Sequence, residues 1–148
     1  MKKRIIYSLL PIVGGVVVGL IISGYMNYGD IVKPPFSPDP IIFQIVWTIL
    51  YILMGTSYFI ATKDNELDKE LDQIYLLQLF VNFLWPIIFF LLKMYFTAFL
   101  WIILLIILVV AMIKELFNKN KISAYIEIPY LIWLIFATYL NIGIFLLN

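Results

Sequence analysis

The stretch Val32–Tyr51, VKPPFSPDPIIFQIVWTILY, joins two very apolar segments, and the rest of the chain is organised around it. Prolines occupy positions 34, 35, 38 and 40. Each proline lacks an N–H, fixes φ and disfavours helix in the residue before it, so residues 33–40 are predicted to form a stiff, non-helical connector. Phe43, Trp47 and Tyr51 then recur every four residues, which places three aromatic rings on one helical face. A rigid lid beside such a face is typical of the mouth of a pocket for a flat apolar molecule.

The composition indicates a membrane protein. Of the 148 residues, 64% are hydrophobic and 13% are charged, whereas roughly 25% would be charged in a soluble domain. The length favours a single domain, residues 1–148. The absence of cysteine and histidine excludes zinc sites, haem ligation by these residues, and catalysis that depends on them. The net charge of +1 gives no reason to expect a nucleic-acid partner.

Five apolar runs are long enough to cross a bilayer. They cover residues 5–28, 41–62, 73–92, 94–113 and 122–147. A helix of about 20 residues spans about 30 Å of hydrocarbon, and unpaired backbone groups are not tolerated there. The first run is too long for a signal peptide, and no cleavage site follows it. The predicted fold is therefore all-α, an integral membrane bundle of five transmembrane helices.

The basic residues predict the orientation. Eight of them lie in the N-terminal tail and in the polar segments 63–72 and 114–121, whereas only Lys33 and Lys93 lie on the other side. By the positive-inside rule, the N-terminus is cytoplasmic, and the first loop and the C-terminus are outside.

Polar side chains inside the spans share helical faces with aromatic ones. The residues concerned are Gln44, Thr48 and Tyr51 beside Trp47; Gln78, Asn82 and Trp85; and Tyr130, Trp133, Ala137 and Asn141. Two interpretations are open. The polar groups could hydrogen-bond between helices, or they could converge on a shared cavity with aromatic walls, which would be a small-molecule site. Tryptophan and tyrosine also gather in belts at membrane interfaces, and Trp101 is assigned to packing or to such a belt.

Three further features have a structural and a functional interpretation. Gly15, Gly19 and Ser23 have the four-residue spacing that lets helices approach closely, either within the chain or at a dimer face. Pro86 predicts a kink in the third helix. Glu127 lies early in the fifth run, and we expect it to be close enough to the interface to reach water.

Three blocks of the sequence resemble one known family. They are Lys33-Pro34, Pro38, Phe43, Val46-Trp47-Thr48, Leu50-Tyr51 and Met54-Gly55; Asn82, Trp85-Pro86 and Ile87-Ile88-Phe89-Phe90; and Pro129-Tyr130-Leu131, Trp133, Phe136-Ala137-Thr138 and Leu140-Asn141. In this order they resemble the TspO/MBR family, the tryptophan-rich sensory proteins that include the mitochondrial translocator protein, or peripheral benzodiazepine receptor.

The resemblance implies a five-helix bundle, commonly a homodimer, that binds porphyrins and isoquinoline- or benzodiazepine-type ligands beneath the first loop. By position, the pocket residues it implies are Trp47, Asn82, Trp85, Trp133, Ala137 and Leu140. Combined with the spacing argument, the expected ligand-binding set is Phe36, Phe43, Trp47, Tyr51, Gln78, Asn82, Trp85, Tyr130, Trp133, Ala137, Leu140 and Asn141. No cofactor is required. Free-base porphyrin fits better than haem, for which only a tyrosine such as Tyr51 or Tyr139 could be an axial ligand.

The chain also departs from the family pattern. Phe36 stands where the family's loop usually has tryptophan, and Pro38-Asp39 stands where it has paired prolines. Ile142 follows Asn141, and no basic residue occurs after Lys121, so the family's C-terminal sterol motif is absent.

The sequence is compatible with three functions. The first is a porphyrin-binding sensor or carrier. The second is an enzyme that degrades protoporphyrin oxidatively in light, for which Trp47 and Trp133 would be the residues to suspect. The third is a ligand-free membrane scaffold, which predicts aromatic stripes that are packed shut.

Overall fold

The fold is a bundle of helices. The computed structural model describes residues 2–25, 31–64 and 68–148, and every regular element in these ranges is helical. The elements are α1 (Lys2–Ile22), the 3₁₀ turn η1 (Ser23–Tyr25), α2 (Pro40–Ala61), α3 (Lys69–Pro86), the π-helical turn η2 (Ile87–Leu91), α4 (Tyr95–Lys119), α5 (Lys121–Ile126) and α6 (Ile128–Leu147).

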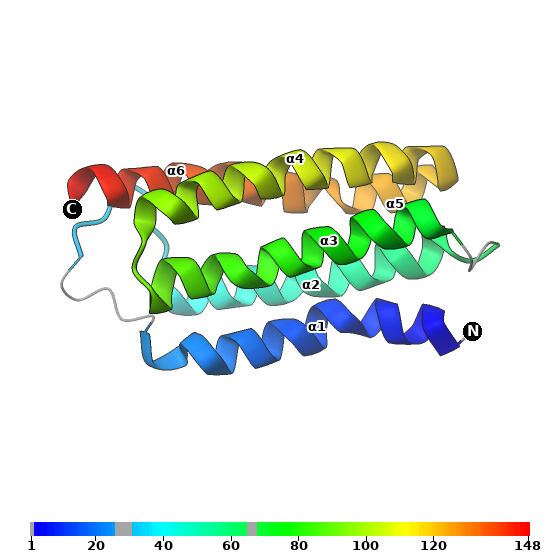
Figure 1. Cartoon of the computed structure of the whole chain (residues 1–148), viewed down its shortest axis with the longest axis horizontal. Coiled ribbons are helices and arrows are strands. Elements are labelled where there is room, and N and C mark those ends of the chain that lie inside the picture. Colours follow the sequence, from blue (N-terminus) through cyan, green and yellow to red (C-terminus); the bar gives the residue numbers. More distant parts are fainter. Residues whose placement is uncertain (1, 26–30, 65–67) are drawn as a thin grey trace.

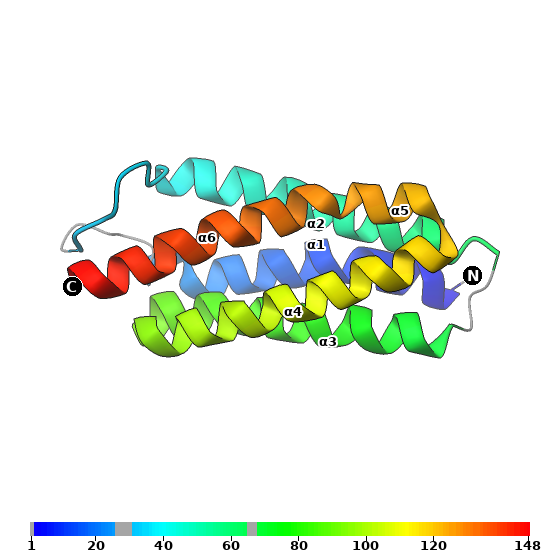
Figure 2. The ribbon, with the colours of Figure 1, turned by 90° about the horizontal axis from the view of Figure 1, so that it is seen from above.

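The helices run along the long axis of the molecule, and the chain ends at opposite ends of the bundle (Figures 1 and 2). Helix α1 packs against α2 and α3, α3 packs against α4, and α4 packs against α6. Among the described residues, five helical segments are long and apolar enough to cross a membrane, and α5 and α6 together form the fifth, Lys121–Leu147. The five predicted spans are thus confirmed.

The polar connectors are shorter than predicted. Helix α4 continues to Lys119, where its ammonium group lies 3.5 Å from the carboxylate of Glu115, one turn earlier. The Asn120 side chain then accepts hydrogen bonds from the backbone N–H groups of Ile122 and Ser123, at 2.9 and 3.2 Å, and so caps α5. Asp68 caps α3 in the same way by accepting from the N–H of Leu71 at 3.1 Å. Local capping therefore extends helix into segments that hydropathy alone assigns to loops.

The irregularity predicted at Pro86 is a π-helical turn. Proline has no N–H to donate, and after it the Leu92 N–H bonds to the Ile87 carbonyl five residues earlier, at 3.0 Å. The chain then turns at Lys93, whose φ of 54° lies in the left-handed region.

The fifth span is interrupted at Glu127, which separates α5 from α6. Pro129 begins the next turn and cannot donate a backbone hydrogen bond, so the interruption has a local cause. The expectation that Glu127 reaches water is wrong, because only 1% of its surface is exposed. Its side chain is enclosed by the bundle, since the carboxyl lies on the inner side of the broken helix.

The small residues of α1 have different surroundings. A Cβ atom on Gly15 would overlap the ring of Tyr51, which confirms close packing within the chain at this position. At Gly19 nothing lies within 4 Å of such a Cβ atom, and Ser23 is exposed. The end of the first predicted span, residues 26–28, lies outside the described residues.

Candidate functional site: an aromatic cavity at one end of the bundle

Aromatic rings from three spans meet near the connector. Phe43, Trp47 and Tyr51 are all buried on one face of α2, as the four-residue spacing predicts. The ring centroid of Trp47 lies 6.4 Å from that of Trp85 on α3, and that of Phe43 lies 5.8 Å from that of Trp133 on α6. Indole rings from α2, α3 and α6 therefore belong to one continuous aromatic cluster.

The polar side chains beside this cluster bond to one another. The Tyr51 hydroxyl donates to Asn82 Oδ1 at 2.6 Å, and Asn82 Nδ2 donates to the Tyr130 hydroxyl at 2.6 Å. The Tyr130 hydroxyl donates in turn to Gln78 Oε1 at 2.8 Å. This series of hydrogen bonds ends at Met54, whose sulfur accepts from Gln78 Nε2 at 3.5 Å. For these residues, hydrogen bonding between helices accounts for the polar stripes.

A second pairing holds the ends of α3 and α6 together. Trp85 Nε1 donates to Asn141 Oδ1 at 2.9 Å, and Asn141 Nδ2 donates to the Tyr95 carbonyl at 2.8 Å. The polar stripes of the third and fifth spans thus bind each other.

A cavity of about 320 Å³ lies where α1, α2 and the end of α3 meet. Phe43, Trp47, Tyr51 and Trp85 form its aromatic wall, and the rest of the lining comes mostly from α1. Ligand sites usually have volumes of about 300–1,000 Å³, so this cavity is of sufficient size for a small molecule. Its rim includes exposed residues of α1 and α2, namely Val16, Leu20, Gln44 and Thr48, so the cavity reaches the outer surface of the bundle.

A second hollow, of about 20 Å³, lies directly beneath the connector. Its lining includes Phe43, Trp85, Ala137, Leu140 and Asn141, all of them predicted site residues. The space under the loop is thus almost filled, and the main cavity lies on the α1 side of the same aromatic wall.

The remaining predicted site residues line neither of these cavities. The hydrogen-bond network that begins at Tyr51 contains Gln78, Asn82 and Tyr130. Trp133 packs behind Phe43. Phe36 is 88% exposed and has a φ of 67°. A broad surface depression of about 740 Å³ beside Lys93 and Phe145 contains no predicted site residue.

Two indole donors in the cluster are unused. Trp47 Nε1 and Trp133 Nε1 are buried and have no hydrogen-bond partner within the described part of the chain. Trp85 and Trp101, by contrast, each donate to an oxygen, at 2.9 and 2.8 Å. A buried donor almost always has a partner, so these two indole N–H groups are exceptions within the cluster.

The connector is held against α6. The Tyr139 hydroxyl donates to the Pro35 carbonyl at 2.8 Å, and the Asn148 side chain bonds to both backbone groups of Val32, at 2.8 and 3.1 Å. Pro34 is buried and packs so closely on Gly143 that a Cβ atom there would overlap its ring. These contacts support the prediction of a stiff lid over this end.

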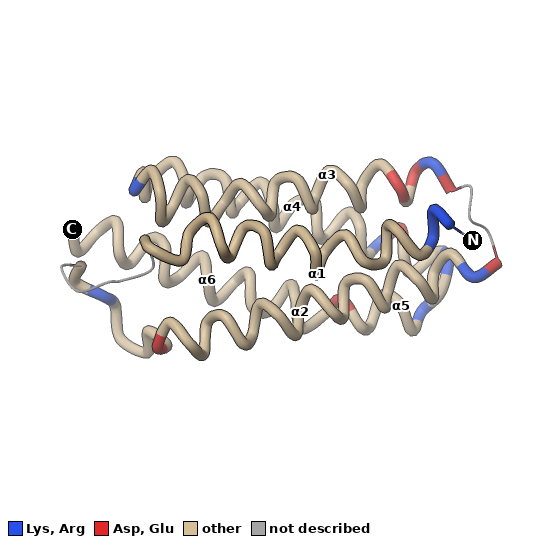
Figure 3. The backbone as a smooth tube through the Cα atoms, turned by 90° about the horizontal axis from the view of Figure 1, so that it is seen from below, with Lys and Arg blue, Asp and Glu red and all other residues tan. Residues whose placement is uncertain are grey.

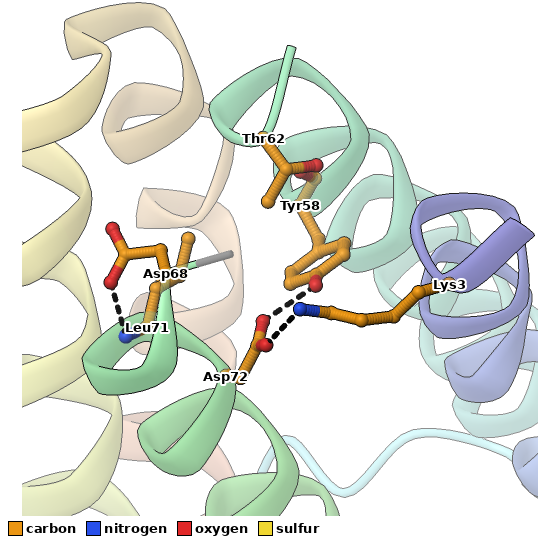
Figure 4. A network of polar contacts seen from close by, with 6 residues as sticks. All are labelled: Lys3, Tyr58, Thr62, Asp68, Leu71 and Asp72. Carbon is orange, nitrogen blue, oxygen red and sulfur yellow. Dashed lines mark hydrogen bonds and ion pairs between the residues drawn. The ribbon is translucent and has the colours of Figure 1, made fainter. Parts of the chain in front are cut away.

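The opposite end of the bundle is closed by polar contacts (Figure 4). The Asp72 carboxylate of α3 pairs with Lys3 of α1 and accepts from the Tyr58 hydroxyl of α2 at 2.6 Å. Asp68 pairs with Lys119 of α4 at 2.7 Å. Burial by itself would raise the pKa of Asp68, but the Lys119 ammonium and the Leu71 N–H together hold that pKa below its ordinary value. Two ion pairs thus join α3 to α1 and α4, and the Tyr58 hydrogen bond adds α2.

Sequence reasoning missed the contribution of α1 to the cavity. The wall includes Ile12, Gly15, Val16, Gly19, Leu20 and Ser23. The stripe of Gly15, Gly19 and Ser23 was the available signal, since small side chains leave room for a cavity as well as for a neighbouring helix.

Comparison with known proteins identifies the family. The model of the TspO/MBR family matches residues 7–147. The chain belongs to the TspO/MBR family. Its relatives include "Tryptophan-rich protein TspO" of Archaeoglobus fulgidus, 37% identical over 82% of this chain and 79% of that protein. "Translocator protein homolog" of Schizosaccharomyces pombe is 32% identical over 95% and 89%, and "Translocator protein" of Ovis aries is 31% identical over 91% and 83%.

Membership in the TspO/MBR family, together with five apolar helices, makes the protein an integral membrane protein of the sensory and translocator type. The three sequence blocks that resemble this family lie on the connector and α2, on α3 and η2, and on α6. Those are the elements that supply the aromatic cluster.

Proposed function

We propose that the protein is a membrane receptor, sensor or carrier that binds porphyrins, such as protoporphyrin IX, and related flat apolar molecules, isoquinoline and benzodiazepine types included. The observation that carries this proposal is the cavity of about 320 Å³ with a wall of Phe43, Trp47, Tyr51 and Trp85. Stacking on these rings suits a flat π-system.

Haem is the weaker candidate ligand. The Tyr51 hydroxyl is bonded to Asn82, and the Tyr139 hydroxyl is bonded to the connector, so neither is free to ligate iron. Protoporphyrin should therefore bind at least as well as haem.

The test is a titration of the detergent-purified protein with protoporphyrin, haem and an isoquinoline ligand, followed by tryptophan quenching and thermal shift. We expect Trp47→Ala to weaken protoporphyrin binding at least severalfold, because it removes a ring from the cavity wall. Trp101→Phe is the matched control, since Trp101 is on α4 and lines neither the 320 Å³ nor the 20 Å³ cavity. A saturating ligand must raise the melting temperature, since it stabilises the folded state by about 2.7 kcal/mol at one hundred times Kd. Equal affinities for the parent and Trp47→Ala would overturn the proposed site, and no thermal shift would favour a scaffold.

Light-dependent degradation of protoporphyrin is the alternative activity. It is favoured by the stacking of Trp47 on Trp85 directly at the cavity wall, where a bound pigment would touch an oxidisable ring. Illumination of the parent and of Trp47→Phe under oxygen distinguishes the two activities. Equal rates of pigment loss in both proteins, or in detergent alone, would exclude this chemistry.

We further propose that the N-terminus is cytoplasmic and that the connector and the C-terminus are outside. Most lysine and arginine residues gather at the end of the bundle that carries the N-terminus (Figure 3). Because the chain has no cysteine, single cysteines at Phe36 and Lys121 can report orientation. Position 36 should react with an impermeant reagent in intact cells, and position 121 should react only after lysis. The homodimer implied by the family stays a prediction, which light scattering of the detergent complex tests.

A further inference from the structure

Glu127 has a buried carboxyl group that takes no part in the proposed ligand site. It lies six residues after Lys121, or about 9 Å along the fifth span at 1.5 Å per residue. Only 1% of Glu127 and 0% of Ser123 are exposed. Glu127 Oε2 and Ser123 Oγ lack a hydrogen-bond partner among residues 2–25, 31–64 and 68–148. Buried polar atoms are almost always paired, so these two require an explanation.

The neighbouring hydroxyl group on α2 has one proton and two possible acceptors, the Glu127 carboxyl and the Ser123 carbonyl. Ser57 faces Glu127 and is itself buried. A serine hydroxyl has one proton to donate, and Ser57 donates it to the backbone carbonyl of Ser123 at 2.9 Å. Donation to an ionised Glu127 would take this proton from the Ser123 carbonyl, whereas a neutral Glu127 can donate to the Ser57 oxygen and leave the carbonyl paired.

The hydroxyl groups of the two nearby tyrosines also donate their protons to other acceptors. Tyr75 of α3 and Tyr130 of α6 both lie within electrostatic range of the Glu127 carboxyl. Tyr75 donates to the Tyr7 carbonyl at 2.6 Å, and Tyr130 donates to Gln78 Oε1 at 2.8 Å. Neither hydroxyl has a second proton for the carboxyl.

Helix α4 also packs against α5, but its charged groups are engaged elsewhere. Lys119 pairs with Glu115 and with Asp68, at 3.5 and 2.7 Å. Lys114 is exposed, whereas Glu127 is enclosed. An ionised carboxylate only accepts hydrogen bonds, and without a counter-charge its burial is very costly.

We propose that Glu127, together with Ser57 and Ser123, forms a proton-binding site inside the membrane-spanning bundle. The carboxyl group binds one hydrogen ion and is held as the neutral acid, whose O–H donates to a serine hydroxyl oxygen. A neutral carboxyl group needs no counter-charge in this enclosed position, and its O–H adds a donor beside the two serine oxygens. The site is independent of the porphyrin cavity, since neither Glu127 nor the two serines line it.

Infrared spectroscopy of the full-length protein in lipid nanodiscs tests this site directly. We expect the parent to show the C=O band of a protonated carboxylic acid at neutral pH and Glu127→Gln to lack it. Asp39→Asn is the matched control, because Asp39 is an exposed carboxylate whose removal should leave the band unchanged. Ser57→Ala or Ser123→Ala should shift the frequency of the band without abolishing it, a change that merely lost packing would not produce. These serine variants also serve if Glu127→Gln does not fold. A parent without the band, or a band that persists in Glu127→Gln, would overturn the proposal.

Thermal unfolding supplies a second readout. In the unfolded chain Glu127 loses its proton well below neutral pH, whereas the folded protein keeps it, so raising the pH from neutral to alkaline favours unfolding. The melting temperature of the parent should fall over this range more steeply than that of Glu127→Gln, while Asp39→Asn should follow the parent. Equal slopes for the parent and Glu127→Gln would contradict the proposal.

Discussion

At the scale of single residues, the Tyr130 hydroxyl determines how the polar stripes of the spans are used. It accepts from Asn82 and donates to Gln78, so one group satisfies two side chains of α3 from α6. Asn82 in turn accepts from Tyr51 of α2. Three helices are therefore held in register by side-chain bonds in a region where backbone groups are already paired within each helix.

Replacing Tyr130 by Phe should destabilise the bundle. The change removes one hydroxyl and leaves Asn82 Nδ2 and Gln78 Oε1 without this partner in a buried site, at a cost of about 1–3 kcal/mol for each unsatisfied group. Thermal unfolding in a fixed detergent measures the loss. Tyr125→Phe is the matched control, because Tyr125 is 61% exposed and its ring contact with Phe117 survives the change. Equal melting temperatures for the two variants would contradict the importance of the network.

At the scale of elements, the approach of α1 to α2 depends on a glycine. A Cβ atom at Gly55 would overlap the backbone carbonyl oxygen of Ser8, which a rotamer change cannot relieve. Gly19 lies on the same interface, where nothing is within 4 Å of an added Cβ atom. Gly55 therefore fixes the distance between α1 and α2, and Gly19 leaves the space that the cavity occupies.

Gly55→Ala should lower the melting temperature and displace α1, because the backbones of the two helices must separate to admit a methyl group. Gly19→Ala should be neutral or slightly stabilising, since alanine favours helix over glycine by up to about 1 kcal/mol. Thermal unfolding of both variants in the same detergent compares them. A Gly55→Ala protein as stable as Gly19→Ala would mean that the two helices are not in close contact.

The spans could be predicted from the sequence because hydropathy and length are local properties. Which helices pair is not local, so the position of the cavity was missed: nothing in the order of residues says that Gly19 and Leu20 face Trp47 across an open space. The same reason explains why the sequence did not predict the burial of Glu127. Its depth along the span could be counted, but its direction depends on the interruption before Pro129 and on the packing of α2 and α4 around it.

At the scale of the whole molecule, the two ends of the bundle differ in kind. One end has the aromatic cavity and a proline-rich lid that is hydrogen-bonded to α6. The other end has two ion pairs that link α3 to α1 and to α4. We therefore expect the stability of the folded protein to fall at acidic pH, because protonation of the carboxylates breaks these ion pairs.

The prediction for acid follows from the sign of the Asp68 shift. Its pKa is lowered in the folded protein, so its contribution is present at neutral pH and is lost as the pH falls through the range in which carboxylates protonate. Asp68→Asn keeps a side-chain oxygen to cap α3 but removes the charge, so its melting temperature should fall less than that of the parent on acidification. Asp64→Asn changes an exposed carboxylate nearby and should follow the parent. A parent and an Asp68→Asn protein with parallel acid profiles would show that the pair with Lys119 contributes nothing.

The cavity meets the outer surface between α1 and α2, in the half of the bundle that carries the connector. We expect a ligand to enter this cavity laterally, between α1 and α2. At the other end of the bundle, the ion pairs Lys3–Asp72 and Lys119–Asp68 hold the helices together. A second exit at that end would require α3 to separate from α1 and from α4. On the proposed function, this arrangement favours entry and exit by a single lateral opening over passage along the length of the bundle.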